Sequence, residues 1–189
     1  YLYGVFIQEG GKAVFGDAET KEGPSITTNR YAAIGENNTM ATADITIYGG
    51  DYTVSTTPAS DAWAPYCAVI YASASGSINI HDGTFTGYYI ISDRYQKVEQ
   101  TVTITGGTFN GTAADLYVTS EGGSGTTANR TIAISGGKFT HKVEEKYCAL
   151  GLKPTETADA DGKYTVEKRT EEAAYVDADG KIAYDTLAN

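Results

Sequence analysis

One pattern of eleven residues occurs four times in this chain, and it limits the fold more than any other feature. The copies begin at Ala43, Gly76, Thr101 and Arg130, and the third reads TVTITGGTFNG. In every copy an isoleucine has an apolar residue two positions before it, a glycine three positions after it and an aromatic residue five positions after it. The alternation predicts a β-strand with one buried face, and the glycine predicts a tight turn at its end.

The aligned positions form three sets of apolar residues. The sets are Ile45, Ile78, Val102 and Ile132; then Ile47, Ile80, Ile104 and Ile134; then Tyr52, Phe85, Phe109 and Phe139. The copies lie 33, 24 and 30 residues apart, a period too short for propeller blades. In a parallel β-helix, equivalent strands stack about 4.8 Å apart, so that like residues form columns. We therefore predict an all-β, right-handed parallel β-helix, a solenoid with irregular coils of 24–33 residues.

A weaker repeat lies between these copies and predicts a second strand in each coil. The segments YAAI, YCAV, YYII and YCAL begin at Tyr31, Tyr66, Tyr88 and Tyr147. DLYV, from Asp115, and YGVF, near the start of the chain, fit the same pattern less well. The four tyrosines are either a stacked column at a corner of the coil or exposed rings that could bind a sugar.

Both cysteines occupy the second position of this weaker repeat. Cys67 and Cys148 would then lie three coils apart, which corresponds to about 14 Å. A disulfide needs Cα atoms within about 7 Å of each other, so we predict two free thiols. Structural zinc needs four ligands, so the two cysteines do not predict a metal site.

The composition changes near His141, where charged residues become frequent. Two Asp-Gly hairpin signals follow, in DADGKYTVEKR and DADGKIAYDTL. We expect residues 154–185 to form a C-terminal β-hairpin cap or connector, because an open end of a β-helix exposes unpaired strand edges. The predicted domains are thus a β-helix over 1–153, this charged tail over 154–185, and the start of a following module over 186–189.

The order of these motifs resembles β-helix modules in large multimodular surface or secreted proteins of gut-dwelling Gram-positive bacteria. The resemblance rests on GGTFN and GGKFT, followed by EEKYCALGLKP, DGKYTVEKR and AAYVDADGKIAYDTLAN. It implies the pectate-lyase-like fold without its catalytic residues, and an extracellular or cell-surface location. The chain starts at Tyr1, without methionine, inside the apolar segment YLYGVFI, so we expect it to be part of a longer polypeptide.

The net charge of −10 and the pI near 4.6 exclude some partners. Nucleic-acid backbones and anionic membrane surfaces both require a basic surface. The sequence also has no apolar run of the roughly 18 residues that a membrane-spanning helix needs. The expected partners are glycans or other copies and modules of the protein, with no nucleic acid and no membrane insertion.

No pattern of residues predicts a catalytic, cofactor or metal site. Pectate-lyase-like β-helices bind Ca²⁺ with clustered aspartates, and the nearest match is Asp93 beside Arg94, with Asp115 one coil above. The ordinary interpretation is a solvated charge pair worth about 0–1 kcal/mol, and no motif supports Ca²⁺. His81 and His141 do not combine with the cysteines into a site, and His81 is expected to be exposed and unpaired.

The longest loop between strands contains the only tryptophan, in SDAWAPY. Long loops on solenoids often carry function, so Trp63 and Tyr66 are candidate glycan-binding residues. The alternative is that the loop folds back and Trp63 covers the flank of the solenoid. Together with Asp93 and Arg94, these two residues complete the set of candidate ligand-binding positions.

Three functions follow, from different classes. The first is a non-enzymatic extracellular structural or adhesion module of a bacterial surface protein. The second is a carbohydrate-active or glycan-binding β-helix, similar to a polysaccharide lyase or a phage receptor-binding segment. The third is a self-assembling fibre or shell subunit. The sequence favours the absence of enzymatic activity without deciding it.

Overall fold

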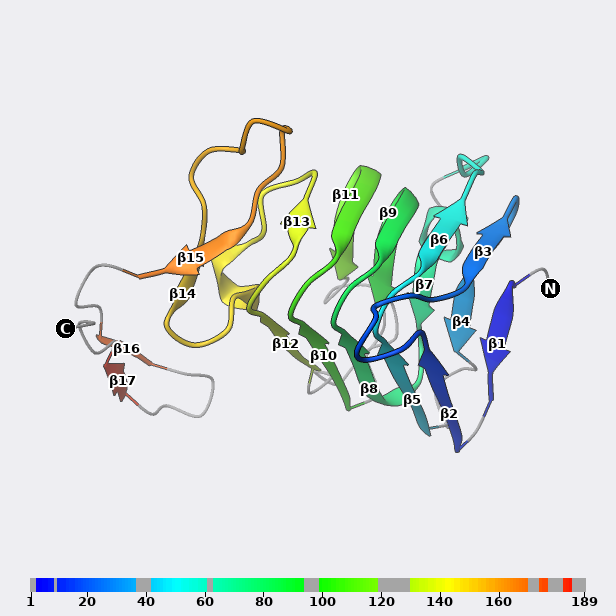
Figure 1. The fold of residues 1–189 in the computed structure, drawn as a ribbon, viewed down its shortest axis with the longest axis horizontal. Coiled ribbons are helices and arrows are strands. Elements are labelled where there is room, and N and C mark those ends of the chain that lie inside the picture. The colour runs from blue at the N-terminus through cyan, green and yellow to red at the C-terminus, as the bar shows by residue number, and fades with distance from the viewer. Residues whose placement is uncertain are drawn as a thin grey trace.

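The regular secondary structure of the described residues is almost entirely β-strand. The computed structural model describes residues 3–8, 10–36, 42–60, 63–93, 99–118, 130–169, 174–176 and 182–184. The strands form two parallel sheets and two antiparallel pairs, and the sheets do not close into a barrel (Figure 1). Two short 3-10 turns, η1 (Ala64–Tyr66) and η2 (Glu145–Tyr147), are present, and no helix in the described residues is long and apolar enough to cross a membrane.

The first parallel sheet contains the alternating strand of every repeat. Its order is β12-β10-β8-β5-β2. The strands are β2 (Gly11–Phe15), β5 (Thr42–Ile47), β8 (Ser75–Ile80), β10 (Gln100–Ile104) and β12 (Arg130–Ile134). Each strand pairs with the equivalent strand of the neighbouring repeat without a slip in register. Both predicted isoleucine columns are therefore confirmed, and their members are buried except for the partly buried Ile132.

The third column is a stack of aromatic rings. Tyr52 and Phe85 lie 5.1 Å apart, Phe85 and Phe109 5.0 Å, and Phe109 and Phe139 4.6 Å between ring centroids. All four rings are fully buried and nearly parallel to their neighbours. The hydroxyl of Tyr52 donates a hydrogen bond of 2.9 Å to the carbonyl of Gly49, which satisfies the one polar group in the column.

The glycine before each aromatic residue forms the predicted turn. Its φ angle is 111° at Gly50, 123° at Gly83, 100° at Gly107 and 108° at Gly137. Residues with a Cβ rarely adopt this region of backbone space, so the turn requires glycine in every copy.

The structure contains a fifth copy, which the sequence pattern did not reveal. In GKAVFG, Ala13 pairs with Ile45 and Phe15 with Ile47, so β2 extends both isoleucine columns by one position. The aromatic position of this copy is taken by Ile26, which pairs with Tyr52. An inserted loop places Ile26 eleven residues after Phe15 instead of five, and this spacing hides the copy in the sequence.

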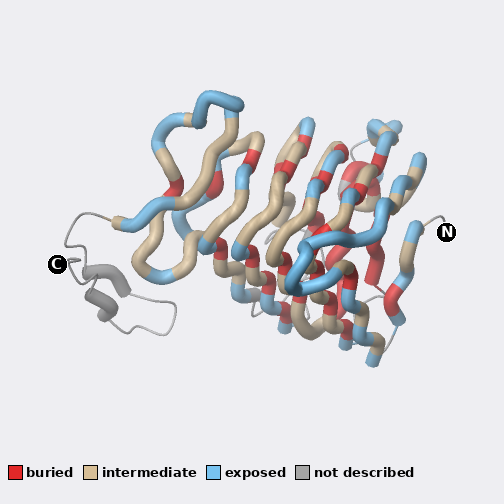
Figure 2. Tube along the Cα trace, viewed as in Figure 1, coloured by how far each residue is buried: buried red, intermediate tan, exposed pale blue. Residues whose placement is uncertain are grey.

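The second parallel sheet has eight strands. They are β1 (Val5–Ile7), β3 (Ser25–Thr28), β4 (Ile34–Glu36), β6 (Asp51–Val54), β7 (Ala68–Ala72), β9 (Thr84–Asp93), β11 (Thr108–Val118) and β13 (Lys138–Phe139). The first half of β9 pairs with β6 and its second half with β7. A single long strand in the later repeats thus corresponds to two strands separated by a loop in the earlier ones. Figure 2 shows that buried positions recur along the stacked strands of both sheets.

The weaker repeat requires a correction of its register. Ile34 pairs with Ile70, not with Val69, and Ile70 pairs with Ile91. Val69 and Ile70 are both buried, and both belong to the hydrophobic core. All five residues of β7 are buried, so no period-two alternation marks its register, and the alignment of YCAV on Tyr66 was one residue out. The alignment of YAAI with YYII was correct.

The two cysteines are free thiols, as predicted, but the reason was wrong. Cys67 precedes β7 of the eight-stranded sheet, whereas Cys148 forms a parallel bridge with Ile134 of β12. Cys148 therefore extends an isoleucine column of the five-stranded sheet. Tyr147 and Tyr66 consequently do not share one position, and the proposed column of four tyrosines is wrong.

The charged tail forms two antiparallel pairs of strands. β14 (Leu152–Pro154) pairs with β15 (Val166–Lys168), and β16 (Ala174–Val176) pairs with β17 (Ile182–Tyr184). Tyr164 forms an antiparallel bridge with Phe139, and Lys163 donates hydrogen bonds to Asn110 and Thr140. These contacts attach the segment before β15 to the last repeat (Figure 1). The domain boundaries stay a prediction.

A buried carboxylate joins three repeats at a corner of the fold. Glu36, at the end of β4, accepts hydrogen bonds from the backbone of Ser73 at 2.8 Å and of Ala74 at 3.0 Å. The side-chain amide of Gln100 donates a third bond of 3.0 Å to the same oxygen. Burying a carboxylate is costly unless donors surround it, and here the donors come from the corner between β7 and β8 and from β10.

The aromatic column predicts a large loss of stability when a central ring is removed. Phe109 lies between two stacked rings and is fully buried. Phe109→Ala should lower the free energy of unfolding by about 3–5 kcal/mol, since it removes apolar contacts and leaves a cavity. Phe109→Leu, the matched control, should cost less because it refills most of the volume. Denaturation in urea measures both values, and equal, small losses would contradict a packed column.

Candidate functional site

A groove lies where two loops interrupt the second sheet. One loop connects β3 to β4 over 29–33, and the other connects β6 to β7 over 55–67. In the later repeats β9 and β11 run through the same region as continuous strands. The groove therefore belongs to the part of the fold that does not repeat.

The two loops are tied to one another by hydrogen bonds. The backbone N–H of Ser55 donates to the carbonyl of Thr28 at 2.9 Å, and the hydroxyl of Thr56 donates to the carbonyl of Asn29. The thiol of Cys67 lies 3.4 Å from the carbonyl oxygen of Arg30. These bonds continue the rung-to-rung pairing of β3 and β6 into the loops, so the walls of the groove are fixed relative to the sheet.

The groove has a volume of about 390 Å³. It is lined by Arg30, Tyr31, Thr56, Thr57, Pro58, Ala59, Trp63 and Cys67. This size falls within the range of small-molecule sites, which combine apolar walls with a few polar groups. Burial raises the pKa of the Cys67 thiol, which keeps it protonated and makes it an apolar part of the lining, not a nucleophile.

Trp63 is the most exposed aromatic residue of the groove. Trp63 is 52% exposed. The centroid of its ring lies 6.4 Å from that of Tyr31 and 5.7 Å from that of Tyr66. The planes are inclined by 47° and 50°, so the neighbouring rings support Trp63 without covering it by parallel stacking. Trp63 thus contacts the flank of the repeats through Tyr31 and Tyr66 while about half of its surface stays exposed, and the choice between a ligand-binding and a covering role stays a prediction.

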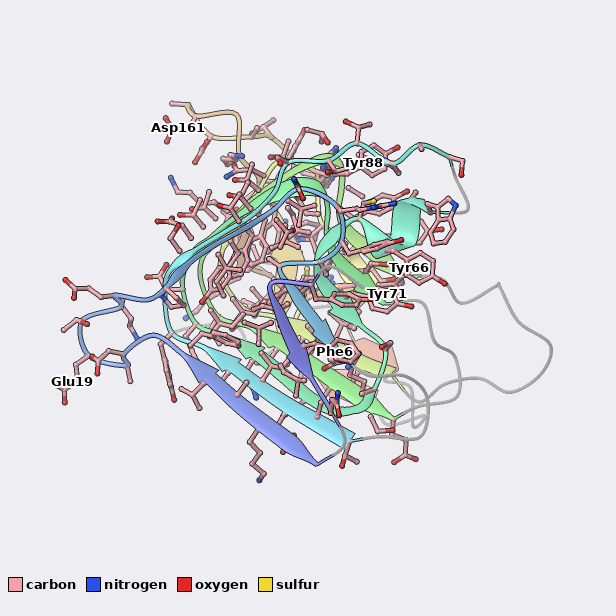
Figure 3. All side chains as sticks on the ribbon, turned by 90° about the vertical axis from the view of Figure 1, so that its right-hand side faces the viewer. Phe6, Glu19, Tyr66, Tyr71, Tyr88 and Asp161 are labelled. Carbon is pink, nitrogen blue, oxygen red and sulfur yellow. The ribbon has the colours of Figure 1, made fainter. Side chains whose placement is uncertain are left out.

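These rings belong to a larger chain of aromatic contacts, which we call the aromatic flank. Its members are Phe6, Tyr3, Tyr31, Trp63, Tyr66 and Tyr71, and successive ring centroids lie 4.9 to 6.4 Å apart. Seen along the stack of strands, Phe6, Tyr66 and Tyr71 lie on one side of the molecule and Glu19 on the opposite side (Figure 3). The flank gives the groove a rigid apolar support.

The structure brings together only part of the predicted set of site residues. Trp63 and Tyr66 are neighbours, as a shared ligand site would require. The backbone of Asp93, the last residue of β9, pairs with Ala72 and Val118, but its side chain and the whole of Arg94 lie outside the described residues. A role for the Asp93–Arg94 pair stays a prediction.

Sequence analysis missed Arg30, Tyr31 and Thr56 as parts of this site. Tyr31 is marked in the sequence as the first residue of the weaker repeat, but that pattern assigned it to a column with other tyrosines. No sequence pattern marks Arg30 or Thr56. They meet only because parallel pairing of β3 with β6 places the two loops side by side.

A second, smaller cavity lies at the last repeat. Its volume is about 170 Å³, and it is lined by Ala114, Asp115, Leu116, Phe139, His141, Lys142, Val143, Glu144 and Tyr147. Asp115 is 3% exposed and lies between Ala114 and Leu116, which pair with Tyr89 and Ile91 of β9. Asp115 was expected one coil above Asp93, but the residue of β11 that pairs with Asp93 is Val118, so this expectation is wrong.

The carboxylate of Asp115 links a bulge in β11 to the start of the tail. It accepts hydrogen bonds of 2.7 Å from the backbone N–H groups of Gly111 and His141. The Nδ1 atom of His141 also lies 3.4 Å from its Oδ2 atom. The strand register shifts between Gly111 and Ala114, so the carboxylate satisfies an N–H that the bulge removes from the ladder. This explains Asp115 as a structural residue.

The described residues include no group of three or more His, Cys, Asp or Glu side chains that could hold a metal ion. His81 is not unpaired as predicted. Its Nδ1 lies 3.1 Å from the Thr105 hydroxyl, and its ring stacks on Tyr48 with 4.8 Å between centroids. The aromatic groove is thus the candidate site that the geometry supports best.

Asp115 predicts a characteristic dependence of stability on pH. Burial is the main cause of a raised pKa, which the hydrogen bonds from His141 and Gly111 only partly oppose. A carboxyl whose pKa is raised in the folded protein contributes its full stabilisation at pH values below its pKa in the unfolded chain, which is near 3.8. This contribution is lost as the pH rises through the pKa of the folded protein. Asp115→Asn removes the titration, so its free energy of unfolding relative to wild type should rise as the pH increases above about 4.

Urea denaturation of the wild type and of Asp115→Asn at a series of pH values measures the difference between their free energies of unfolding. Repeating the comparison in a His141→Gln background removes the imidazole whose Nδ1 atom lies beside the Asp115 carboxyl. A difference that stays constant with pH in both backgrounds would contradict an effect of burial on this carboxyl.

Comparison of the chain with protein-family models, with curated proteins and with solved structures gives no match. Fold and function are therefore assigned from the residues and their geometry. The expected relation to bacterial surface modules rests on the sequence motifs alone.

Proposed function

We propose that this chain is a non-enzymatic adhesion module that binds carbohydrate in the aromatic groove. Trp63, Tyr31 and the threonines of the groove provide the two elements that sugar recognition uses. An aromatic face packs against the C–H groups of a sugar ring, and nearby hydroxyl and backbone groups exchange hydrogen bonds with sugar hydroxyls. The observation that carries this proposal is the exposed Trp63 ring beside a concave surface lined by Tyr31, Thr56 and Thr57.

We further propose that the scaffold is a right-handed parallel β-helix. Equivalent strands of successive repeats pair in parallel in both sheets, with a register shift at the bulge in β11, and parallel stacking is the arrangement that a solenoid of this kind requires. Parallel crossover connections are right-handed in nearly all proteins, which supports the hand. In this arrangement the columns of isoleucine and aromatic side chains fill the interior.

The motif order that resembles bacterial surface modules supports a location outside the cell, as part of a longer polypeptide. An extended solenoid would hold the groove away from the cell surface, since each further repeat adds about 4.8 Å of length. The groove would then lie on the side of the stalk, and a structural and an adhesive role would be combined in one module. Neither an enzymatic reaction nor a resident Ca²⁺ ion is part of this proposal.

Removal of the exposed ring tests the proposal. The chain is applied to an immobilised array of oligosaccharides, and the saccharides that it retains are titrated in solution by calorimetry. Trp63→Ala should weaken binding at least tenfold, because a loss of about 1.4 kcal/mol of stacking and apolar contact has this effect. Leu150→Ala is the matched control, since Leu150 is 69% exposed and does not line the groove.

Tyr31, the tyrosine beside Trp63, allows a finer test. Tyr31→Phe keeps the ring that supports Trp63, whereas Tyr31→Ala removes it. The Phe variant should bind within about threefold of wild type and the Ala variant should lose about tenfold. Retention of no saccharide by the wild-type chain, or unchanged binding in Trp63→Ala, would refute the proposed function.

A further inference from the structure

A charged side chain lines the groove, and its environment indicates what kind of saccharide would bind. Among the described residues that line the groove, only Arg30 carries a charge. Arg30 is exposed, and its guanidinium lies 6.0 Å from the centroid of the Tyr31 ring. The cation therefore stands at the same aromatic wall on which a sugar would stack.

Most basic side chains of the described residues are paired with a carboxylate. Those within 4.0 Å of one are Lys12, Lys138, Lys142, Lys146, Lys153 and Arg169. Arg30 has no such partner in the described part of the chain, although acidic residues outnumber basic ones by 24 to 14. A guanidinium presents five N–H donors in a planar fork that fits a carboxylate or a sulfate with two parallel hydrogen bonds.

We infer that the aromatic groove recognises an anionic saccharide, whose negative group pairs with the Arg30 guanidinium while its ring packs on Trp63. This inference rests on the proposed carbohydrate-binding function and specifies its ligand. Thr57 lines the same groove, and its hydroxyl is a neutral donor. The net charge of −10 repels anions at long range, but charges farther than about 8 Å are largely screened at physiological salt. The local cation therefore decides the preference.

The shape of the groove favours a terminal sugar over the interior of a long chain. Its walls are the loop 29–33 and the loop 55–67, which both belong to the first two repeats. The corresponding region of the later repeats is occupied by the continuous strands β9 and β11. A polymer lying across many repeats would leave the groove, whereas one or two sugar units match a volume of about 390 Å³.

A matched pair of ligands tests the inference. The wild-type chain is titrated with a glucuronyl disaccharide and with the methyl ester of the same disaccharide, which differ only in the negative charge. The acid should bind about tenfold more tightly than the ester, and this preference should shrink as salt is raised. A third arm uses the corresponding disaccharide with a sulfate ester in place of the carboxylate, which identifies the anionic group that fits the guanidinium better.

Substitutions assign the preference to the side chain. Arg30→Gln should bring the affinity for the acid to that for the ester and leave the affinity for the ester unchanged. Arg30→Lys should retain only part of the preference, because an ammonium keeps the charge but loses the paired hydrogen bonds. Arg30 is exposed, so all variants should keep the circular dichroism spectrum of the wild type.

The outcomes separate this inference from the proposed function. Equal affinities for acid and ester, both lost in Trp63→Ala, would overturn the anionic preference and leave carbohydrate binding intact. A preference for the acid that survives in Arg30→Gln would also overturn the role of Arg30. Binding of no saccharide to the wild-type chain would overturn the proposed function itself.

Discussion

The rest of the structure depends on the stacking of like side chains between successive repeats. A single repeat has strands too short and an apolar face too small to be stable alone, so neighbouring repeats must complete its core. The rings of Phe85 and Phe109, 5.0 Å apart, show the consequence, because each aromatic residue is buried chiefly by its equivalents. Parallel pairing fixes the spacing of strands, and the spacing in turn requires side chains of similar shape in each column. The turn glycines follow from the same constraint, since the chain must bend at the same point in every repeat.

Polar groups enter this stack where its regularity ends. Glu36 lies at a corner formed by three repeats, and Asp115 lies at a bulge in β11. In both places backbone N–H groups leave the regular ladder and a buried carboxylate accepts their hydrogen bonds. A carboxylate with several donors is tolerated in the interior, whereas an unpaired N–H there would cost about as much as a lost hydrogen bond. Both acids are thus explained by the backbone around them without invoking catalysis.

The candidate site has a similar origin, since it lies where the second sheet is interrupted. Two loops replace the strand that is continuous in later repeats, and parallel pairing of β3 with β6 places these loops next to each other. Arg30 and Trp63, 33 positions apart in the chain, consequently line one groove. The repeating part of the molecule provides rigidity, and the part that varies between repeats provides a surface of distinct chemistry. The proposed binding of an anionic saccharide takes place on this varying surface, which the repeating part supports.

The sequence by itself determined the alternating strands of four repeats, their turns and the columns of Ile47, Ile80, Ile104 and Phe109, because each of these depends on local alternation that recurs at recognisable spacings. It also indicated Trp63 and Tyr66, since a unique tryptophan in a long loop is visible without any knowledge of contacts. Only the tertiary structure decided the positions of Cys148, Ile26 and Asp115, because a loop of variable length or a bend in a strand changes the register without leaving a periodic signal. The pairing of Arg30 with the aromatic groove was decided there as well. It depends on which loops become neighbours when strands stack, and stacking is a long-range property that local sequence patterns do not record.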